Sequence, residues 1–513
     1  MSPGRSAAAT ARSGVVRVDR VTRPVDDVAL AEALDPLVLA VDIGSTASRG
    51  GVYDAAGRPV TGLRHKVPHA FTVSPAGASV IDPDQVVAEV EQILDAVTAD
   101  RALGTRLAGV AMDTFAASLI AVDADGRPLT PCLTYADSRC AGEVATLRAE
   151  LDERAVQQRT GTRIHTSYHA PRLRWLARTE PRTFAAAAGW WSLGEYVYRR
   201  LIGVNAAGTS TAAWTGLLDR RTGDLDADLL AAVGVRAEQF SPVHDLADTV
   251  DPTRTPRWPA LAGARWFPVI TDGFASNVGA GATDPTVLAA ATATSGALRV
   301  LLAGPAEPLP FGMWNYRVDG DRTLLGGALN DVGRAISWAQ STLRLDRDPG
   351  ATLAADPSSA TPLVLPYLTG ERAPGWAADA HAVITGVTAA TDAAALYRGT
   401  VEGIALTYAR VATELGPAAP EVGQVVASGR VSNDQPAWLQ VLADVLERPV
   451  THVTLKRSTL RGTALLALGV LAPDVPRAPR ATGDTYEPVA SRAAYYAERR
   501  ARFDEAYGAV VRR

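Results

Sequence analysis

The feature that most constrains the fold is an apolar strand that stops abruptly at a polar turn, and both halves of the chain contain it. The run Leu37-Val-Leu-Ala-Val-Asp-Ile43 ends in Gly44-Ser45-Thr46. In the second half, Phe267-Pro-Val-Ile-Thr271 ends in Asp272-Gly273, and a helix rich in small residues is expected to follow. A continuous apolar run is typical of a strand buried on both faces. We therefore expect α/β architecture in each half, with helices packed against the sheet.

The length of the chain predicts two domains. Its 513 residues exceed what one hydrophobic core usually serves. The polar, Pro-rich segment 251–259 is the expected boundary, which gives domains at 37–258 and 259–513. Residues 1–36 lack a continuous apolar stretch, so we expect a disordered extension there, with a transit-like segment as the alternative.

Composition excludes several classes of protein. With 47% hydrophobic residues, 21% charged residues and a net charge of −4, the chain is neither mainly disordered nor attracted as a whole to nucleic acid. No apolar run approaches the roughly 20 residues of a membrane helix. The two cysteines, Cys132 and Cys140, cannot form a disulfide framework. We expect a cytoplasmic protein with no nucleic-acid or membrane partner, and a homodimer stays open.

Glycine stands with Ser, Thr or Asp at four expected strand ends, namely 42–46, 272–273, 294–296 and 429–433. Such turns let backbone N–H groups approach anionic oxygens. One turn alone would be ordinary, and neither a Walker A pattern nor Gly-x-Gly-x-x-Gly occurs. The turn at 294–296 echoes the turn at 44–46, which either duplication or chance would explain.

Read together, five segments resemble the FGGY carbohydrate kinases. In the order found in that family, they are Asp42–Arg49, Tyr135–Arg139, Thr271–Asn277, Leu365–Pro374 and Trp438–Asp444. The resemblance implies two actin-like ATPase (ribonuclease H-like) domains, with the sugar and ATP bound in the cleft between them and with ATP and Mg²⁺ as cofactors.

The same resemblance suggests the substrate. Glu371-Arg-Ala-Pro-Gly-Trp376 and the Ala-Asp-Ser-Arg segment at 136–139 look most like gluconate kinases. The small-molecule partner implied is therefore gluconate, phosphorylated at its terminal hydroxyl. A ketopentose such as xylulose, or another polyol, is the alternative. A catalytically silent sugar sensor of the same fold is an alternative of a different class.

The resemblance also implies roles for residues of the catalytic and nucleotide sites. Asp272 is similar to the family's catalytic base, which takes the proton of the attacking hydroxyl. Asp42 matches an aspartate that helps to hold Mg²⁺, with Asp272 as a second metal contact; a turn aspartate is the alternative for either. The implied phosphate and nucleotide contacts are Gly44, Ser45, Thr46, Arg49, Thr294, Gly296, Gly333, Gly429, Arg430 and Asn433.

Two of the nucleotide-binding segments depart from the family pattern. Ala293 replaces a glycine that is usual before Thr-Ser-Gly. Arg430 replaces a small residue, so it would stack on adenine, obstruct it or lie free in solvent.

The implied sugar-binding positions carry short polar groups and carboxylates, which suit a polyol. They are Asp113, Thr114, Tyr135, Asp137, Arg139, His165, Ser167 and Asp272. A gluconate carboxylate also needs a cation, for which Arg139 or Arg163 could serve. The alternative for Arg139 is an inter-helix ion pair.

Two other patterns favour no new site. His165 and His169 have the spacing of one helix face, but no HExxH arrangement accompanies them, so zinc is not expected. The Arg-rich segment 498–502 is expected to be the solvated face of a helix.

Overall fold

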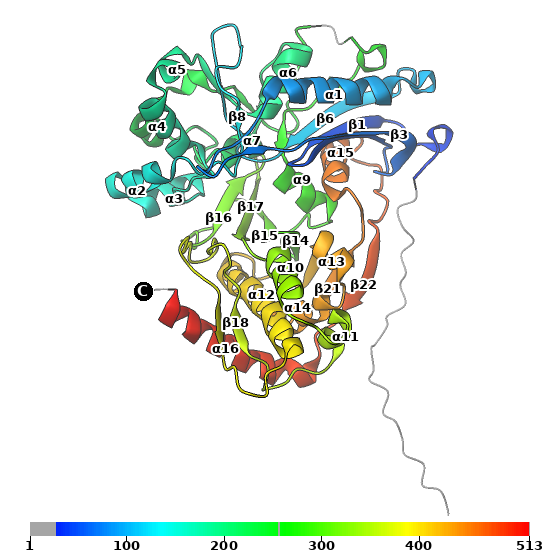
Figure 1. Ribbon diagram of the computed structural model, residues 1–513. Coiled ribbons are helices and arrows are strands. Elements are labelled where there is room, and N and C mark those ends of the chain that lie inside the picture. Colours follow the sequence, from blue (N-terminus) through cyan, green and yellow to red (C-terminus); the bar gives the residue numbers. More distant parts are fainter. Residues whose placement is uncertain (1–26, 255–256, 512–513) are drawn as a thin grey trace, which may run out of the picture.

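The computed structural model describes residues 27–254 and 257–511, which form two lobes (Figure 1). The first lobe is built on a sheet with the strand order β12-β6-β1-β2-β3, and β13 also pairs with β6. Strands β1, β2 and β3 form an antiparallel meander, and β6 runs parallel to β1. The strands are β1 (Leu37–Ile43), β2 (Ala47–Tyr53), β3 (Pro59–Pro68), β6 (Leu107–Thr114), β12 (Arg265–Trp266) and β13 (Ile270–Thr271).

The second lobe repeats this connectivity. Its sheet has the order β16-β17-β15-β14-β20-β21-β22. Strands β14, β15 and β17 pair antiparallel to one another, and β20 and β21 run parallel to β14. The strands are β14 (Val287–Thr292), β15 (Gly296–Ala303), β16 (Trp314–Arg317), β17 (Arg322–Leu329), β20 (Gln424–Ser428), β21 (Val450–Val453) and β22 (Thr482–Tyr486). The expected α/β fold of two actin-like domains is therefore confirmed.

Side chains of β1 point alternately to the two faces of the sheet, and both faces are covered, which explains why its apolar run is continuous. All seven residues of β1 are buried. Leu39 and Val41 belong to the core beneath helix α1, whereas Val38 and Ala40 pack with helix α15 on the other face. The apolar stripe on one face of 84–98, preceded by Asp82-Pro83, predicts a helix there. Helix α1 spans Pro83–Thr98, and Asp82 caps its N-terminus.

Other helices and short strands complete the two lobes. The helices are α2 (Ala141–Glu150), α3 (Glu153–Thr160), α4 (His169–Thr179), α5 (Pro181–Ala186), α6 (Leu193–Ile202), α7 (Thr209–Trp214), α8 (Ala227–Val233), α9 (Asp272–Gly279), α10 (Gly333–Thr342), α11 (Pro349–Ala354), α12 (Ala393–Leu415), α13 (Arg430–Asp434), α14 (Trp438–Leu446), α15 (Ser458–Leu471) and α16 (Ala493–Val510). The short strands are β4 (Thr72–Val73), β5 (Ser79–Ile81), β7 (Ile120–Val122), β8 (Cys132–Leu133), β9 (Gly189–Trp191), β10 (Ala207–Gly208), β11 (Val243–His244), β18 (Leu363–Leu365) and β19 (Val383–Thr385). None of the described helices is both long and apolar enough to cross a membrane.

Helices α9 and α15 approach each other unusually closely. A Cβ atom added at Gly279 would lie 1.8 Å from the carbonyl oxygen of Ser458, and one added at Gly462 would lie 1.8 Å from the carbonyl oxygen of Ala275. Only hydrogen fits in such a space. Because α15 also packs on β1 and β6, this contact fixes α9 against the first sheet.

The chain is ordered earlier than we expected. Residues 1–26 of the expected extension lie outside the described residues. Val28 is buried and pairs with Val60, and Arg106 donates hydrogen bonds to the carbonyl oxygens of Leu30 and Ala33. The domain boundary near residue 258 stays a prediction; β12 and β13, which follow it, pair with β6 of the first sheet.

Two local expectations were wrong. Of the strand expected at 267–271, only Ile270–Thr271 forms a strand (β13). A separate short strand, β12, ends at Trp266, because the chain leaves the sheet between Trp266 and Ile270. The helix at 498–502 is not simply a solvated face. Arg499 is 3% exposed, pairs with Glu402 at 3.0 Å and donates to the carbonyl oxygens of Thr361 and Pro362.

Candidate functional site

Three carboxyl groups gather at the ends of neighbouring strands in the first lobe. Asp42, near the end of β1, is the register partner of Asp113 on β6. Ile270 of β13 pairs with Asp113, so Asp272, at the start of α9, follows beside it. Parallel strands end at one edge of a sheet, and ligands of α/β proteins commonly bind there.

The carboxyl groups of Asp42 and Asp113 affect each other's pKa. Burial raises the pKa of Asp113 well above its usual range, and the charge of Asp42 raises it further. Burial also raises the pKa of Asp42, although Arg49, whose Nη1 lies 3.2 Å from Asp42 Oδ2, opposes this. Arg49 thus pairs with a carboxylate of its own hairpin, as its register opposite Asp42 dictates.

Asp272 is held in place by backbone and charge. The N–H groups of Gly273 and Ala116 donate to its carboxylate. Burial raises its pKa to about 6, with a further rise from Asp42 and an opposing effect of Arg299. A carboxylate with this pKa is ionised at neutral pH and basic enough to accept a proton.

Arg299 links the second lobe to this site. It lies on β15, and its Nη1 donates to the carbonyl oxygen of Gly273 at 3.3 Å and to the hydroxyl of Ser276 at 3.0 Å. The guanidinium therefore holds the first turn of α9, and with it Asp272, against the second sheet.

The turn between β1 and β2 is supported by a buried network that the sequence did not reveal. His69 Nε2 lies 2.8 Å from the carbonyl oxygen of Gly44, and its Nδ1 lies 2.8 Å from Glu89 Oε2. Burial disfavours the charge of Glu89, but hydrogen bonds from His69 and Ser48 lower its pKa. Thr46 at the tip stays exposed. His69 is a single histidine between expected elements, so no sequence pattern points to this network.

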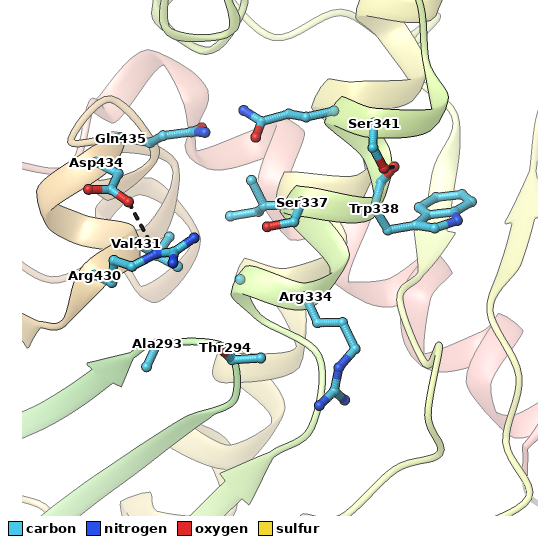
Figure 2. A pocket seen from close by; sticks show the side chains of 13 residues that line it. Ala293, Thr294, Arg334, Ser337, Trp338, Ser341, Arg430, Val431, Asp434 and Gln435 are labelled. Atoms are coloured by element: carbon cyan, nitrogen blue, oxygen red, sulfur yellow. Dashed lines mark hydrogen bonds and ion pairs between the residues drawn. The ribbon is translucent and has the colours of Figure 1, made fainter. Parts of the chain in front are cut away.

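The second lobe contains a cavity of about 540 Å³ between α10, α13 and the β14–β15 turn (Figure 2). It is lined by Ala293, Thr294, Gly333, Arg334, Ile336, Ser337, Trp338, Gln340, Ser341, Arg430, Val431, Asp434 and Gln435. Of the predicted nucleotide contacts, Thr294, Gly333 and Arg430 line it. The side chain of Arg430 is 80% exposed and pairs at 3.3 Å with Asp434, one turn further along α13, which forms one wall of the cavity (Figure 2).

The other predicted residues of this lobe lie beside the cavity or support its walls. A Cβ atom at Gly429 would lie 2.5 Å from the carbonyl oxygen of Thr292, which explains why this turn needs glycine. A Cβ atom at Gly296 would lie 2.2 Å from the hydroxyl of Tyr408. Asn433 faces His452 on β21, with its Oδ1 3.0 Å from His452 Nε2, and does not line the cavity.

Two of the predicted sugar contacts satisfy each other. Asp137, which is 1% exposed, accepts hydrogen bonds from the guanidinium of Arg139 and from the N–H of Ser79. The Arg139 guanidinium also lies 4.3 Å from the ring centre of Trp175. Likewise, Arg163 pairs with Glu153 at 2.7 Å. Both arginines proposed for a substrate carboxylate are thus engaged within the protein.

The remaining predicted sugar contacts leave polar atoms available. Tyr135 is 41% exposed, and its hydroxyl forms a hydrogen bond with Ser45 of the first turn. The N–H of Ser167 donates to His165 Nδ1 at 3.1 Å. Burial and the charge of Arg372 lower the pKa of His165 to about 3, so its imidazole is neutral. Thr114 is buried and is the last residue of β6.

His165 and His169 do not share a helix face. His169 begins α4, whereas His165 precedes it. In residues 27–254 and 257–511, no group of three or more His, Cys, Asp or Glu side chains is arranged to hold a metal directly.

The strand-end carboxylates nevertheless fit a hard cation held through water. Asp113 Oδ1 is buried, receives no hydrogen bond from the described residues and lies beside the carboxyl group of Asp42. Magnesium commonly keeps several waters and binds through only one or two carboxylates. Asp42 and Asp272 are the residues that would hold it, and its charge would neutralise phosphate oxygens.

Two family models match this chain, and both describe domains of one family. Residues 37–280 match the model of the N-terminal domain of the FGGY family of carbohydrate kinases, and residues 288–469 match the model of its C-terminal domain. The gluconokinase of Bacillus subtilis is 24% identical over 459 residues, covering 84% of this chain and 87% of that protein. The glycerol kinase of Rhodospirillum centenum is 30% identical over 458 residues, covering 84% and 89%.

Solved structures show the same fold. Gluconate kinase from Lactobacillus acidophilus superposes with a TM-score of 0.85 at 24% identity, over 93% of this chain and 98% of that one. Xylulose kinase from the same organism gives a TM-score of 0.84 at 24% identity, over 92% and 98%.

Proposed function

The chain belongs to the FGGY family of carbohydrate kinases, and from that premise we propose that it transfers the terminal phosphoryl group of ATP to gluconate, giving 6-phosphogluconate. The observation that carries this proposal is Asp272, a carboxylate oriented by two backbone N–H groups at a strand end, with its pKa raised to about 6. A general base works best when its pKa lies near the working pH.

In the proposed reaction, Asp272 accepts the proton of the sugar hydroxyl as its oxygen attacks the terminal phosphorus of ATP. The bond from that phosphorus to the bridging oxygen breaks, and ADP leaves. Much of the catalysis of phosphoryl transfer comes from positioning and from neutralising charge. Arg299 supports the position of Asp272 by holding the first turn of α9.

The cavity of the second lobe is the proposed nucleotide site. Its volume of about 540 Å³ suits a ligand of nucleotide size. Thr294 and Gly333 lie where backbone and hydroxyl groups would meet the phosphates, and Arg430 would stack on the adenine. Mg²⁺, held near Asp42 and Asp272, would supply positive charge to the phosphates.

Gluconate is the proposed acceptor because the Glu371–Trp376 segment resembles gluconate kinases and a gluconokinase is among the relatives. A polyol or ketopentose is the second candidate. The glycerol kinase at 30% identity and the xylulose kinase fold favour it.

A coupled assay of ADP release over a panel of substrates tests the proposal. Gluconate, xylulose, glycerol and sorbitol are compared at equal concentration with ATP and Mg²⁺. The proposal expects the largest kcat/KM for gluconate. A larger kcat/KM for xylulose or glycerol would assign the second candidate, and no turnover of any panel member would favour a sugar sensor.

A further inference from the structure

Arg372 is a cation of the second lobe whose side chain has neither a hydrogen-bond partner nor an ion-pair partner among the described residues. It lies in the loop between β18 and β19, and its buried Nε has no hydrogen-bond acceptor. Neither a side-chain hydrogen bond nor an ion pair of Arg372 occurs within the described ranges 27–254 and 257–511. A buried N–H group without an acceptor is costly, so a binding role is the simplest reason to keep a guanidinium with an unpaired Nε there.

The loop holds Arg372 against a fixed aromatic ring. Trp376 adopts a left-handed backbone conformation with φ of +57°, and its Nε1 donates to the carbonyl oxygen of Gly312 at 2.7 Å. The Arg372 guanidinium lies 5.8 Å from the centre of this ring. Its position is therefore set by the rigid turn that follows it.

His165 of the first lobe packs against the same Trp376 ring. The ring centres of His165 and Trp376 are 5.1 Å apart. Since the N–H of Ser167 donates to Nδ1, the proton of the neutral imidazole is on Nε2. No acceptor for Nε2 occurs in the part of the chain that the structure describes, so this N–H is free to donate.

The charge of Arg372 reaches the predicted sugar contacts. It lowers the pKa of His165, after the larger effect of burial, and it opposes the rise in the pKa of Tyr135. Asp272 acts on Tyr135 with the opposite sign. Tyr135 thus lies within the field of both the proposed base and the unpartnered cation.

The other cations near this site are already engaged. Arg139 pairs with Asp137, Arg163 with Glu153, and Arg49 with Asp42. Arg299 donates to Gly273 and Ser276. Recruiting any of them would break an existing contact.

We propose that Arg372, together with the Nε2–H group of His165, binds the carboxylate of the acceptor sugar and so selects a sugar acid over an uncharged sugar. This inference rests on the proposed kinase function and names the substrate class of that site. The sugar would lie with its carboxylate between the two lobes at Arg372 and its reacting hydroxyl at Asp272. A guanidinium binds a carboxylate with two parallel hydrogen bonds, which gives both affinity and orientation.

The test compares charged and uncharged acceptors in Arg372→Gln, a variant of similar length without charge. The wild-type enzyme is first assayed with aldonic and uronic acids and with the matching polyols and ketoses. For the preferred sugar acid, we expect KM to rise about 10- to 100-fold in R372Q. KM for a poorly used polyol and KM for ATP should stay within about twofold. Arg236→Gln, at a surface arginine that is 74% exposed, is the matched control.

A readout without turnover checks folding and binding together. In calorimetry without ATP, the sugar acid should bind the wild type and R236Q equally and bind R372Q about 10- to 100-fold more weakly. Equal weakening for acid and polyol, or a rise in the KM of ATP alone, would overturn the inference, the latter by assigning Arg372 to phosphate.

The failure of this inference is distinguishable from failure of the proposed function. A wild-type enzyme that prefers another sugar acid over gluconate would contradict gluconate and support Arg372. An enzyme that prefers an uncharged sugar, with R372Q unchanged, would overturn the inference and leave a working kinase.

Discussion

Asp42 and Asp113 are register partners on adjacent parallel strands, and a hydrogen bond joins their carboxyl groups. Such a bond requires a proton on one of them. Asp113 is the more deeply buried, and its other oxygen accepts a hydrogen bond from the hydroxyl of Thr463. We infer that Asp113 keeps its proton and donates it to an ionised Asp42, which leaves one negative charge at the strand ends.

Asp113→Asn tests this proton. The amide can still accept from Thr463 and donate to Asp42, so the variant should fold. The folded-state pKa of Asp113 is above its ordinary value of 3.8, so its contribution to stability is present at acid pH and is lost as pH rises through the folded-state pKa. Without Mg²⁺, the Tm of D113N minus the Tm of the wild type should therefore increase as pH rises from 5 to 8. A constant Tm difference across this range would mean that Asp113 is ionised in the folded protein.

Gly462→Ala tests the close contact between α9 and α15. The new methyl group would meet the carbonyl oxygen of Ala275, so α9 must move, at a cost of about 1–3 kcal/mol in stability. Because Asp272 starts α9, kcat should also fall, by about tenfold or more. Gly469→Ala on the same helix, where a Cβ meets nothing within 4 Å, should raise stability slightly and keep kcat. Equal Tm and kcat values for the two variants would show that the close contact between α9 and α15 affects neither stability nor catalysis.

Ser337→Trp tests where the nucleotide binds. Ser337 lies on α10 and faces the cavity of the second lobe (Figure 2). An indole there would fill space needed by adenine, so ATP affinity measured by calorimetry should fall at least tenfold while the Tm changes little. Thr342→Trp, at an exposed position of α10 outside the cavity, is the control. Normal ATP binding by S337W would place the nucleotide elsewhere.

The sequence predicted the features that depend on local pattern. The apolar run at 37–43 and its turn gave the correct strand and strand end, and helix α1 begins within one residue of its expected start. These features are set by hydrophobic alternation and capping, which neighbouring residues carry. Helix α16 was also expected, but the burial of Arg499 was not, because Glu402 lies 97 positions away in the chain.

In the candidate site, too, local sequence pattern predicts some residues, whereas the contacts of others depend on tertiary packing. Asp42 and Asp272 could be selected because each follows an apolar strand. The partners of Arg139 and Arg163 could not be foreseen, since charge pairing among many arginines and carboxylates depends on how the helices of the first lobe pack. The same is true of Arg372. Its lack of a hydrogen-bond or ion-pair partner among the described residues is a property of the assembled lobes and leaves no mark in the sequence.

The central claim is that Asp272 is the general base of a sugar kinase. Asp272→Asn keeps the size of the side chain but cannot take a proton. Asp228→Asn, at a carboxylate that is 87% exposed, is the control.

The most direct measurement is kcat on the best acceptor from the panel, taken beside the Tm and the ATP affinity of each variant. We predict that D272N loses about 10²- to 10⁴-fold in kcat. Its Tm and ATP affinity should match those of the wild type, because burial already disfavours the charge of Asp272. A D272N variant with near-normal kcat, or one whose lost activity is matched by lost folding, would contradict the claim.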